Sequence, residues 1–327
     1  MDIKEIRTYL EGPLFRVEAI MENCLRSDIS LLDATNRSLM ERSGKMLRPI
    51  LCLLVSGACS GSGPNPDSEK FAAATELLHN ATLLHDDVVD GSGLRRGKPT
   101  VMSILGSPAS VLIGDYWLVK AMDSILSAEK CSEVVIRIFA KTLSDLAEGE
   151  MLQLQKTASC DTTEEDYLRI IYCKTASLFE AAAVSGAISV GADGASLEAV
   201  RSYARNLGIA FQIKDDMLDY EGTDVIGKPS GVDILEQKIT MPLLEALHSV
   251  SPEEASAVRK KVGEVVENPS VAEDIKQFVH DHEGISRSRG RVHDFISKAI
   301  SSLSPLPESK EKSYLALLAE FVGKRDS

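Results

Sequence analysis

Aspartates occur twice in the chain with the same spacing, as Asp-Asp-x-x-Asp at residues 86–90 and again at residues 215–219. In a helix, the first and last aspartates of such a stretch lie on one face, one turn apart. Like charges at this distance repel one another, and a cation relieves the repulsion. Mg²⁺ fits well, because it takes few carboxylates and completes its octahedron with water and substrate phosphates. A single stretch is also compatible with a solvated acidic helix end, but the repetition favours metal binding.

Basic residues follow each acidic stretch in a glycine-containing loop. Residues 91–98 contain Arg95, Arg96 and Lys98, and the loop after the second stretch contains Lys228. Arginine and lysine side chains bind the oxygens of phosphate groups. Two acidic helix faces beside two cationic loops therefore predict metal ions that bridge a polyanion, and a diphosphate fits this description.

From about Gly44 to Lys238 the chain resembles the trans-isoprenyl diphosphate synthases, or polyprenyl synthetases. Several separate motifs carry the resemblance, and all stand in the order that the family has. The segments outside this region, 1–40 and 245–327, show no motif. The motifs are Gly44-Lys45-Met46-Leu47-Arg48-Pro49, His79 with Asp86-Asp87-x-x-Asp90, Arg95-Arg96-Gly97, Gln153, Lys174-Thr175, Phe211-Gln212 with Asp215-Asp216-x-x-Asp219, Lys228 and Lys238.

The resemblance implies a role for each of these residues. It implies that the first acidic stretch binds two Mg²⁺ ions through Asp86 and Asp90, assisted by Asp87. Asp215 then binds a third ion, with Asp216 and Asp219 close to it. The expected ligands of the allylic diphosphate are Arg95, Lys174, Lys228 and Lys238, and those of isopentenyl diphosphate are Lys45, Arg48, His79 and Arg96.

The implied reaction is ionisation of the allylic C–O bond, condensation and elimination, repeated. Pyrophosphate leaves readily only when its developing charge is neutralised, which is the expected function of the metals and the basic side chains. Thr175 and Gln212 are expected along the allylic cation, where their oxygen dipoles stabilise positive charge. The released pyrophosphate is the nearest base, so no protein side chain is assigned as general base.

Two small residues, Ala81 and Thr82, stand five and four positions before Asp86. In the family, bulk at these positions blocks the tunnel for the growing chain. They lie roughly 6–7.5 Å along the helix from Asp86. The first acidic stretch also lacks the two-residue insertion of many short-chain members. We therefore expect a medium- or long-chain all-trans product, with a deeper stopping point among Leu77, Leu78 and residues of the expected helix 100–127.

Composition limits the other possibilities. The chain has 327 residues, 44% hydrophobic and 26% charged, with a formal net charge of −13. Nucleic acid is not expected as a partner, because binding to phosphate backbones requires clustered lysine and arginine. The six cysteines form no metal or disulfide pattern. Residues 1–20 are charged throughout and no long apolar run follows, so a cytoplasmic location is expected.

Apolar residues recur at helical spacing along nearly the whole chain, and alternating strand patterns are absent. The sequence therefore predicts an all-α fold, with residues 1–327 as one domain and about 10–13 helices around a central cavity. The expected helices are about 2–24, 29–41, 49–59, one capped near Asp67 that contains 76–90, 100–127, 132–157, 164–189, 196–221, 236–248, 253–265, 270–303 and 310–324.

Several alternatives remain open from the sequence. One is a short-chain synthase that makes farnesyl or geranylgeranyl diphosphate, and another is a non-catalytic regulatory subunit of the same fold. A metal phosphohydrolase would use His85-Asp86 but leaves the second acidic stretch unexplained. A terpene cyclase would have a different second metal motif. The resemblance also implies a homodimer, and a strongly apolar product makes a transient membrane contact during release plausible.

Overall fold

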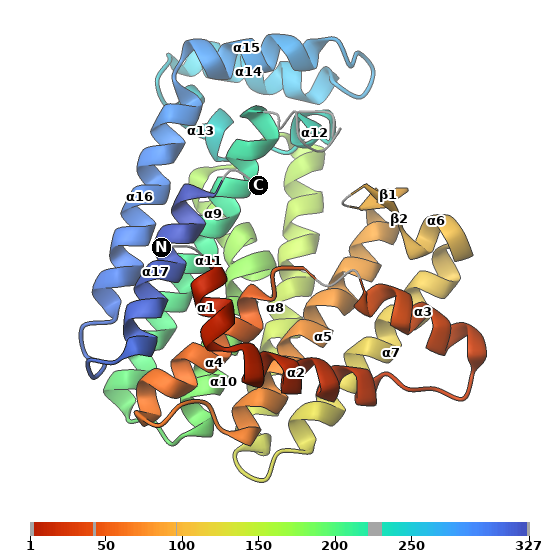
Figure 1. Ribbon diagram of the computed structural model, residues 1–327. Helices are drawn as coiled ribbons and strands as arrows, with labels where there is room; N and C mark the ends of the chain where they lie inside the picture. The colour runs from red at the N-terminus through yellow and green to blue at the C-terminus, as the bar shows by residue number, and fades with distance from the viewer. Residues whose placement is uncertain (1–2, 42–43, 96, 222–230, 326–327) are drawn as a thin grey trace. The chain divides into compact units, whose positions relative to one another are not determined.

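The computed structural model describes residues 3–41, 44–95, 97–221 and 231–325. Within these ranges the chain is almost entirely helical, with a single two-stranded hairpin, which confirms the all-α prediction (Figure 1). The elements are α1 (Ile3–Tyr9), α2 (Glu11–Cys24), α3 (Ser30–Met40), α4 (Leu47–Ser60), α5 (Pro66–Val89), β1 (Leu94–Arg95), β2 (Lys98–Pro99), α6 (Val101–Leu105), α7 (Ser107–Leu126), α8 (Ser132–Ser159), α9 (Glu164–Ile171), the π-helix η1 (Tyr172–Ala176), α10 (Ser177–Ser189), α11 (Gly194–Glu221), α12 (Val232–Leu235), α13 (Met241–Leu247), α14 (Pro252–Glu264), α15 (Val271–Asp281), α16 (Gly284–Ser302) and α17 (Lys310–Lys324).

The chain packs as two compact units. Unit 1 comprises residues 1–141, 178–202 and 302–318, and unit 2 comprises residues 142–177, 203–301 and 319–327. That residues 1–327 form one domain stays a prediction.

Helix α5 is the central element of unit 1 and carries the first acidic stretch at its end. Asn65 caps its start: the Asn65 side chain accepts from the Ser68 backbone N–H, and the Ser68 hydroxyl accepts from the Asn65 N–H, at 2.8 and 3.0 Å. Pro66 occupies the first helical turn, where a missing N–H costs nothing. Asp67, expected near the cap, instead accepts from the backbone N–H groups of Glu129 and Lys130. The capping expectation was thus two residues late.

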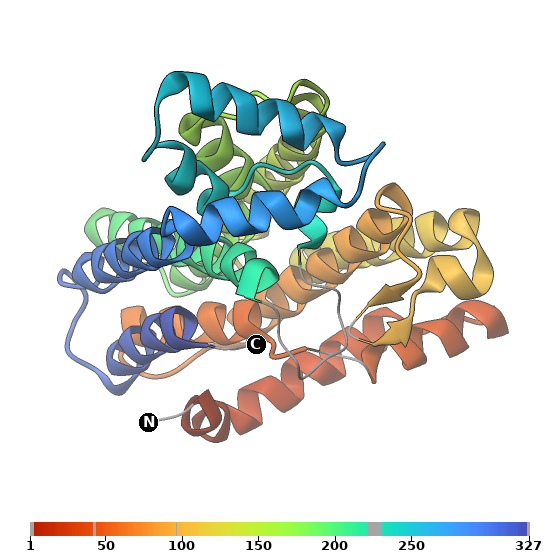
Figure 2. The same cartoon turned by 90° about the horizontal axis from the view of Figure 1, so that it is seen from above.

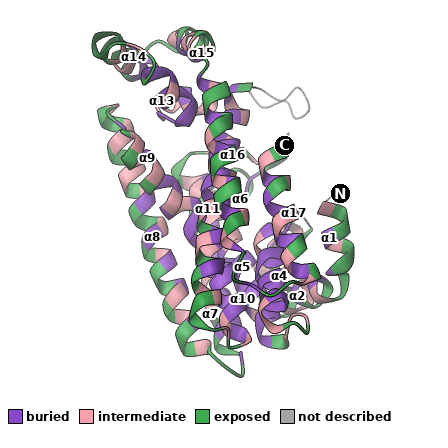
Figure 3. Cartoon of the chain, turned by 90° about the vertical axis from the view of Figure 1, so that its left-hand side faces the viewer, coloured by how far each residue is buried: buried purple, intermediate pink, exposed green. Residues whose placement is uncertain are grey.

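The core of unit 1 includes α4 and α10, both of which are buried along most of their length (Figure 3). Their backbones approach closely at Gly186, where an added Cβ would lie 2.3 Å from the Cys52 carbonyl oxygen. Only glycine permits this contact. It lets the backbones of the two helices pack directly against each other.

Helix α7 lies along α5 and is linked to it by hydroxyl groups. The Ser110 hydroxyl donates to the Leu84 carbonyl at 2.8 Å, and the Ser124 hydroxyl donates to the Lys70 carbonyl at 2.9 Å. Hairpin β1–β2 follows the end of α5 in both views (Figures 1 and 2), with Arg95 paired to Lys98. The end of α5 and the hairpin therefore form one local structure.

In unit 2, the π-helix η1 is wedged between α8 and α11. A Cβ at Gly149 of α8 would lie 2.6 Å from the Cys173 Cβ, and a Cβ at Gly208 of α11 would lie 2.5 Å from the Ala176 Cα. The absence of side chains at both glycines lets the wide π turn fit. These contacts fix the backbone that carries Lys174 and Thr175.

The structure breaks several helices that the sequence predicts as continuous. The expected helix 270–303 is two helices, because Glu283 adopts a left-handed conformation with φ of 56°. The expected helix 236–248 begins only at Met241, after Gln237 with φ of 57°. Similar breaks divide 2–24, 100–127 and 164–189, so the described residues contain more helices than expected. Among the described helices, none combines the length and apolar character that crossing a membrane requires.

Candidate active site

The first acidic stretch lies at the C-terminal end of α5 in unit 1. Asp86 is half-buried, Asp90 is exposed at the helix end, and Asp87 is only 4% exposed. Negative charge at a helix C-terminus is unfavourable, since the helix dipole is negative there. Three carboxylates in this place therefore have a physical reason to bind cations. Asp86 and Asp90, which share a helix face, are the accessible pair.

Arg95 lies beside this stretch and pairs with its middle aspartate. The Arg95 Nε donates to the Asp87 carboxylate at 2.8 Å. Burial raises the pKa of Asp87, and the contact with Arg95 opposes this shift. The hairpin thus holds Arg95 close to the acidic stretch, as its predicted role requires. Arg96, predicted for the second substrate, lies outside the described residues.

The other residues predicted for isopentenyl diphosphate surround the start of α4. Lys45 is exposed two residues before the helix begins, and its carbonyl accepts from Arg7 at 3.0 Å. Arg48 lies in the first turn, with its guanidinium carbon 4.6 Å from the centre of the Phe179 ring. A helix N-terminus with two basic residues favours an anion. His79 is half-buried on α5.

In unit 2, the aspartates of the second acidic stretch differ sharply in their surroundings. Asp215 is 41% exposed and pairs with Arg325, which is 7% exposed, at 2.6 Å. Arg325 also donates to the Phe211 carbonyl at 2.8 Å and stacks on the Phe211 ring. Burial lowers the pKa of Arg325. Asp215 is therefore the accessible aspartate of this stretch, and it is neutralised by a residue that the motifs do not include.

Asp216 is buried, and both of its carboxylate oxygens accept hydrogen bonds. Tyr167 donates to one oxygen at 2.6 Å and Gln212 donates to the other at 2.8 Å. Burial raises the pKa of Asp216 to about 7, against the effect of these two hydrogen bonds. Asp219 accepts from the backbone N–H groups of Val232 and Asp233 at 3.2 and 3.1 Å. These surroundings favour a supporting role for Asp216 and Asp219 beside Asp215, and their metal binding stays a prediction.

A cavity of about 140 Å³ lies in unit 2 and gathers five of the predicted residues. Two are basic, and each is paired with a nearby glutamate at 2.5 Å: Lys174 with Glu150, and Lys238 with Glu236. These pairs hold the ammonium groups in place until an anion competes for them. The predicted residues that line the cavity are Lys174, Thr175, Gln212, Asp216 and Lys238, together with the motif residue Gln153. Lys228 lies outside the described residues.

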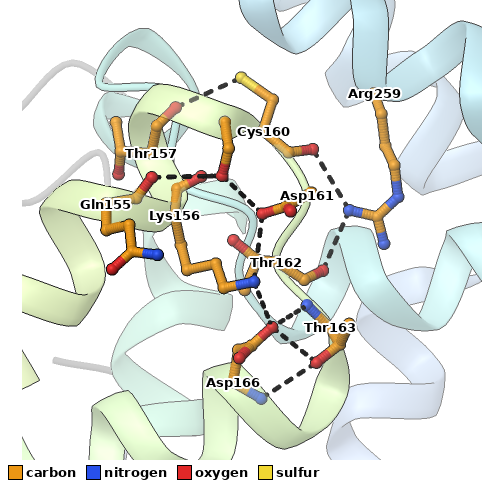
Figure 4. A network of polar contacts seen from close by, with 10 residues as sticks. Gln155, Lys156, Thr157, Cys160, Asp161, Thr162, Thr163, Asp166 and Arg259 are labelled. Atoms are coloured by element: carbon orange, nitrogen blue, oxygen red, sulfur yellow. Dashed lines mark hydrogen bonds and ion pairs between the residues drawn. The ribbon is translucent and has the colours of Figure 1, made fainter.

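One edge of this cavity is fixed by a polar network around the turn between α8 and α9 (Figure 4). Lys156 pairs with Asp161 and Asp166 at 3.2 and 2.9 Å. Arg259 of α14 donates to the carbonyls of Cys160 and Thr162. Because Lys156 and Thr162 both line the cavity, the network gives that edge a defined shape.

The two residues predicted to control product length lie inside α5. Ala81 is 1% exposed, so a larger side chain there must displace its neighbours. Thr82 is half-buried, and its hydroxyl donates to the His79 carbonyl at 2.8 Å. Leu77 and Leu78 are fully buried one turn earlier. Their function as a chain-length control stays a prediction.

Metal binding by this chain would require ligands besides the protein. Within the described parts of the chain, no three histidine, cysteine, aspartate or glutamate side chains already surround one point. Mg²⁺ does not need such a cage, because it keeps water and binds one or two carboxylates plus substrate phosphates. Asp86 and Asp90 in unit 1, and Asp215 in unit 2, fit that requirement in ligand chemistry.

Sequence reasoning missed four residues that touch the predicted ones: Tyr167, Arg325, Glu150 and Glu236. Glu150 stands three residues before the motif residue Gln153, and Glu236 stands two residues before Lys238. These positions offered a weak signal of charge pairing. Tyr167 and Arg325 carried no signal, because only the fold brings them to the second acidic stretch.

The model of the polyprenyl synthetase family matches residues 29–281 of the chain. This protein belongs to the polyprenyl synthetase family. It is 35% identical over 327 residues to octaprenyl diphosphate synthase of Escherichia coli K12, with all of both chains covered. A decaprenyl diphosphate synthase structure from Rhodobacter capsulatus superposes with a TM-score of 0.91 at 34% identity, with all of both chains covered. A polyprenyl synthase structure from Caulobacter crescentus CB15, solved with calcium and isoprenyl diphosphate, superposes with a TM-score of 0.90 at 34% identity. The match covers 100% of this chain and 98% of that one.

Membership in the polyprenyl synthetase family makes this chain a prenyltransferase. The relatives that match it over their full length include medium- and long-chain polyprenyl diphosphate synthases. The resemblance stated from the motifs is thereby confirmed. Membership in the family also implies dependence on a divalent metal and prenyl diphosphates as substrates.

Proposed function

We propose that this prenyltransferase condenses isopentenyl diphosphate repeatedly with an allylic diphosphate, farnesyl or geranylgeranyl, to form an all-trans medium- or long-chain polyprenyl diphosphate. The observation that carries the proposal is the full-length similarity to octaprenyl diphosphate synthase, in a chain that retains every motif residue quoted above. A non-catalytic subunit would be expected to have lost some of them.

Asp86 and Asp90 in unit 1 and Asp215 in unit 2 would hold Mg²⁺, which would supply positive charge to neutralise a leaving diphosphate. Lys174 and Lys238 add fixed positive charge in the unit 2 cavity, after exchanging their glutamate partners for phosphate oxygens. Thr175 and Gln212 present oxygens on the wall of the same cavity, where they stabilise an allylic cation. Lys45, Arg48 and His79 bind the second diphosphate in unit 1.

The direct test is incubation with farnesyl diphosphate, isopentenyl diphosphate and Mg²⁺, followed by dephosphorylation and mass analysis of the prenols. We expect a ladder that ends in one long prenol. Termination at the geranylgeranyl stage, or at the farnesyl stage when geranyl diphosphate is the primer, would keep the enzyme class and refute the argument from Ala81 and Thr82. A folded protein that condenses neither primer would instead be the non-catalytic subunit.

The proposal includes a homodimer. Helix α7 of unit 1 carries exposed apolar side chains at seven-residue spacing, Leu112, Val119 and Leu126, which form one stripe. A second copy of the chain would cover this stripe. Val119→Glu should then yield a monomer in sedimentation analysis, and an unchanged dimer would place the interface elsewhere. A cytoplasmic location, with brief membrane contact as the apolar product leaves, belongs to the same proposal.

A further inference from the structure

Four side chains of unit 2 form a continuous hydrogen-bonded chain that ends at the cavity. The Tyr167 hydroxyl donates to Asp216 at 2.6 Å, and the Gln212 amide donates to the other Asp216 oxygen at 2.8 Å. The Thr175 hydroxyl donates to the Gln212 carbonyl oxygen at 2.7 Å. The chain runs from α9 through α11 to the π-helix η1. Tyr167 is 3% exposed and Asp216 is 5% exposed, so water does not compete with these contacts.

The direction of the hydrogen bonds is set at Asp216, where both carboxyl oxygens accept. Since one accepts from Tyr167 and the other from Gln212, Gln212 turns its NH₂ group toward Asp216. Its carbonyl oxygen then faces Thr175 and takes the hydroxyl proton. The Thr175 oxygen keeps its lone pairs as acceptors. At this place the cavity wall therefore presents oxygen atoms rather than protons.

We infer that Tyr167 is a positioning residue: by holding Asp216 in place, it sets the orientation of Gln212 and thereby turns the Thr175 oxygen toward the position where an allylic cation forms. The inference rests on the proposed function. Tyr167 and Gln212 both line the cavity, and the Tyr167 hydroxyl binds the Asp216 oxygen that Gln212 does not.

The backbone around Thr175 cannot supply this orientation by moving. Residues Cys173 and Ala176 of η1 abut Gly149 and Gly208 at distances that leave no room for a Cβ. The only freedom left to Thr175 is the rotation of its hydroxyl and side chain. A hydrogen-bonded partner of fixed polarity removes that freedom, which is how preorganised dipoles stabilise developing charge.

The test uses Tyr167→Phe, which removes the hydroxyl and keeps the ring. Two unreactive ligands are compared with Mg²⁺ present. One is a farnesyl diphosphate analogue with an ammonium nitrogen at the carbon that becomes cationic, and the other is farnesyl thiolodiphosphate, called the neutral analogue because its prenyl chain carries no charge. We expect the variant to bind the ammonium analogue about tenfold more weakly and the neutral analogue as the wild type does. The kcat should fall by a similar factor, with KM for both diphosphates within about twofold.

A second variant, Asp216→Asn, tests the same inference by allowing the hydrogen bonds between residue 216, Gln212 and Thr175 to reverse their direction. Asparagine can donate to the Gln212 carbonyl, so the amide can turn over and the Thr175 proton is no longer accepted by Gln212. The same selective loss of affinity for the ammonium analogue is expected. Because both analogues carry the same metal-bound diphosphate, any weakening of metal binding affects them equally. This variant remains informative if Tyr167→Phe does not fold.

A double-mutant cycle with Thr175→Val shows whether Tyr167 acts through Thr175. In the Thr175→Val background, Tyr167→Phe should weaken binding of the ammonium analogue by less than twofold further. Tyr203→Phe is the matched control, since Tyr203 is fully buried in the same unit, and it should leave the ratio of the two affinities unchanged.

Three results would overturn the inference: equal loss of affinity for both analogues, an undiminished effect in the Thr175→Val background, or the same ratio in Tyr167→Phe and Tyr203→Phe. Failure of the proposed function is distinguishable from all three. In that case the wild-type protein itself makes no prenol and does not bind either analogue.

Discussion

The Arg325 guanidinium lies 2.6 Å from the carboxylate of Asp215. Arg325 is the last described residue and is held on α11 by three contacts, to Asp215, to the Phe211 carbonyl and to the Phe211 ring. It neutralises the aspartate that is the most accessible of its acidic stretch. A metal ion and Arg325 therefore compete for the same carboxylate.

Arg325→Met removes that competition while keeping an apolar side chain over Phe211. We expect the Mg²⁺ concentration for half-maximal activity to fall about two- to fivefold, in line with a partly exposed ion pair. Mg²⁺ titration of the reaction rate measures it. Lys324→Met, which alters a neighbouring exposed pair with Glu320, should change nothing. An unchanged Mg²⁺ titration for Arg325→Met would argue that Asp215 does not bind the metal.

Ala81→Phe should shorten the products. Ala81 is buried in α5, so the new ring takes space that neighbouring side chains or a growing prenyl chain would use. Overpacking costs about 1–3 kcal/mol of stability, so thermal unfolding is measured beside product mass. Thr82→Ala, which removes a hydroxyl without adding bulk, should leave product length unchanged. Wild-type product length from a folded Ala81→Phe protein would contradict the placement.

The metal-free protein should lose stability as the pH rises from 4 to 7, because of Asp216. Its pKa in the folded protein is about 7, raised by burial from an ordinary value of 3.8. The folded state thus holds the proton more tightly, and the contribution is complete below pH 4 and lost as pH approaches 7. Asp216→Asn cannot titrate. In urea unfolding with a chelator, the free energy of unfolding of the variant relative to the wild type should therefore rise by up to about 1.4 kcal/mol per pH unit in this window. A difference independent of pH would argue against the raised pKa.

Gly114→Ala should destabilise the protein through His85. A Cβ at Gly114 would lie 2.4 Å from the His85 Nε2, and His85 also contacts Asp115 of the same helix at 3.2 Å. Displacing this ring disturbs the residue immediately before Asp86. We expect a loss of about 1–3 kcal/mol in urea unfolding, together with lower activity.

The control for this effect is the combination with His85→Ala. Once the ring is absent the added methyl group meets no atom of it, so Gly114→Ala should cost much less in that background. Gly194→Ala, at a position with nothing within 4 Å, should be close to neutral. Additive losses from the two substitutions would show that the ring is not the obstacle.

The sequence predicts the all-α fold and the motif residues well because both depend on local patterns. The spacing of Asp86 and Asp90 follows from helical periodicity alone, and the motifs are read without knowing the fold. Helix ends are predicted less well. Glu283 breaks the expected helix 270–303 in a left-handed conformation that non-glycine residues adopt only when tertiary contacts favour it.

The partners of the motif residues could not be predicted. Tyr167 precedes Asp216 by 49 residues and Arg325 follows Asp215 by 110, so no local rule connects them. The sequence likewise gives no sign that Asp216 is enclosed and Asp215 accessible, because the two are neighbours of identical type. Burial distinguishes them, and burial is a property of the packed unit.

The extra residue of the π-helix η1 is needed for the geometry of the cavity wall, but an ordinary helix could form without it. A π turn contains one residue more than the α turn that would replace it. Deletion of Tyr172 would let the segment from Glu164 to Ser177 close into an ordinary α-helix, with no residue left over. The residues before the deletion would then be turned by about 100° relative to those after it. Length variation by a single residue at this point is therefore a route by which such a chain can remain folded yet become inactive.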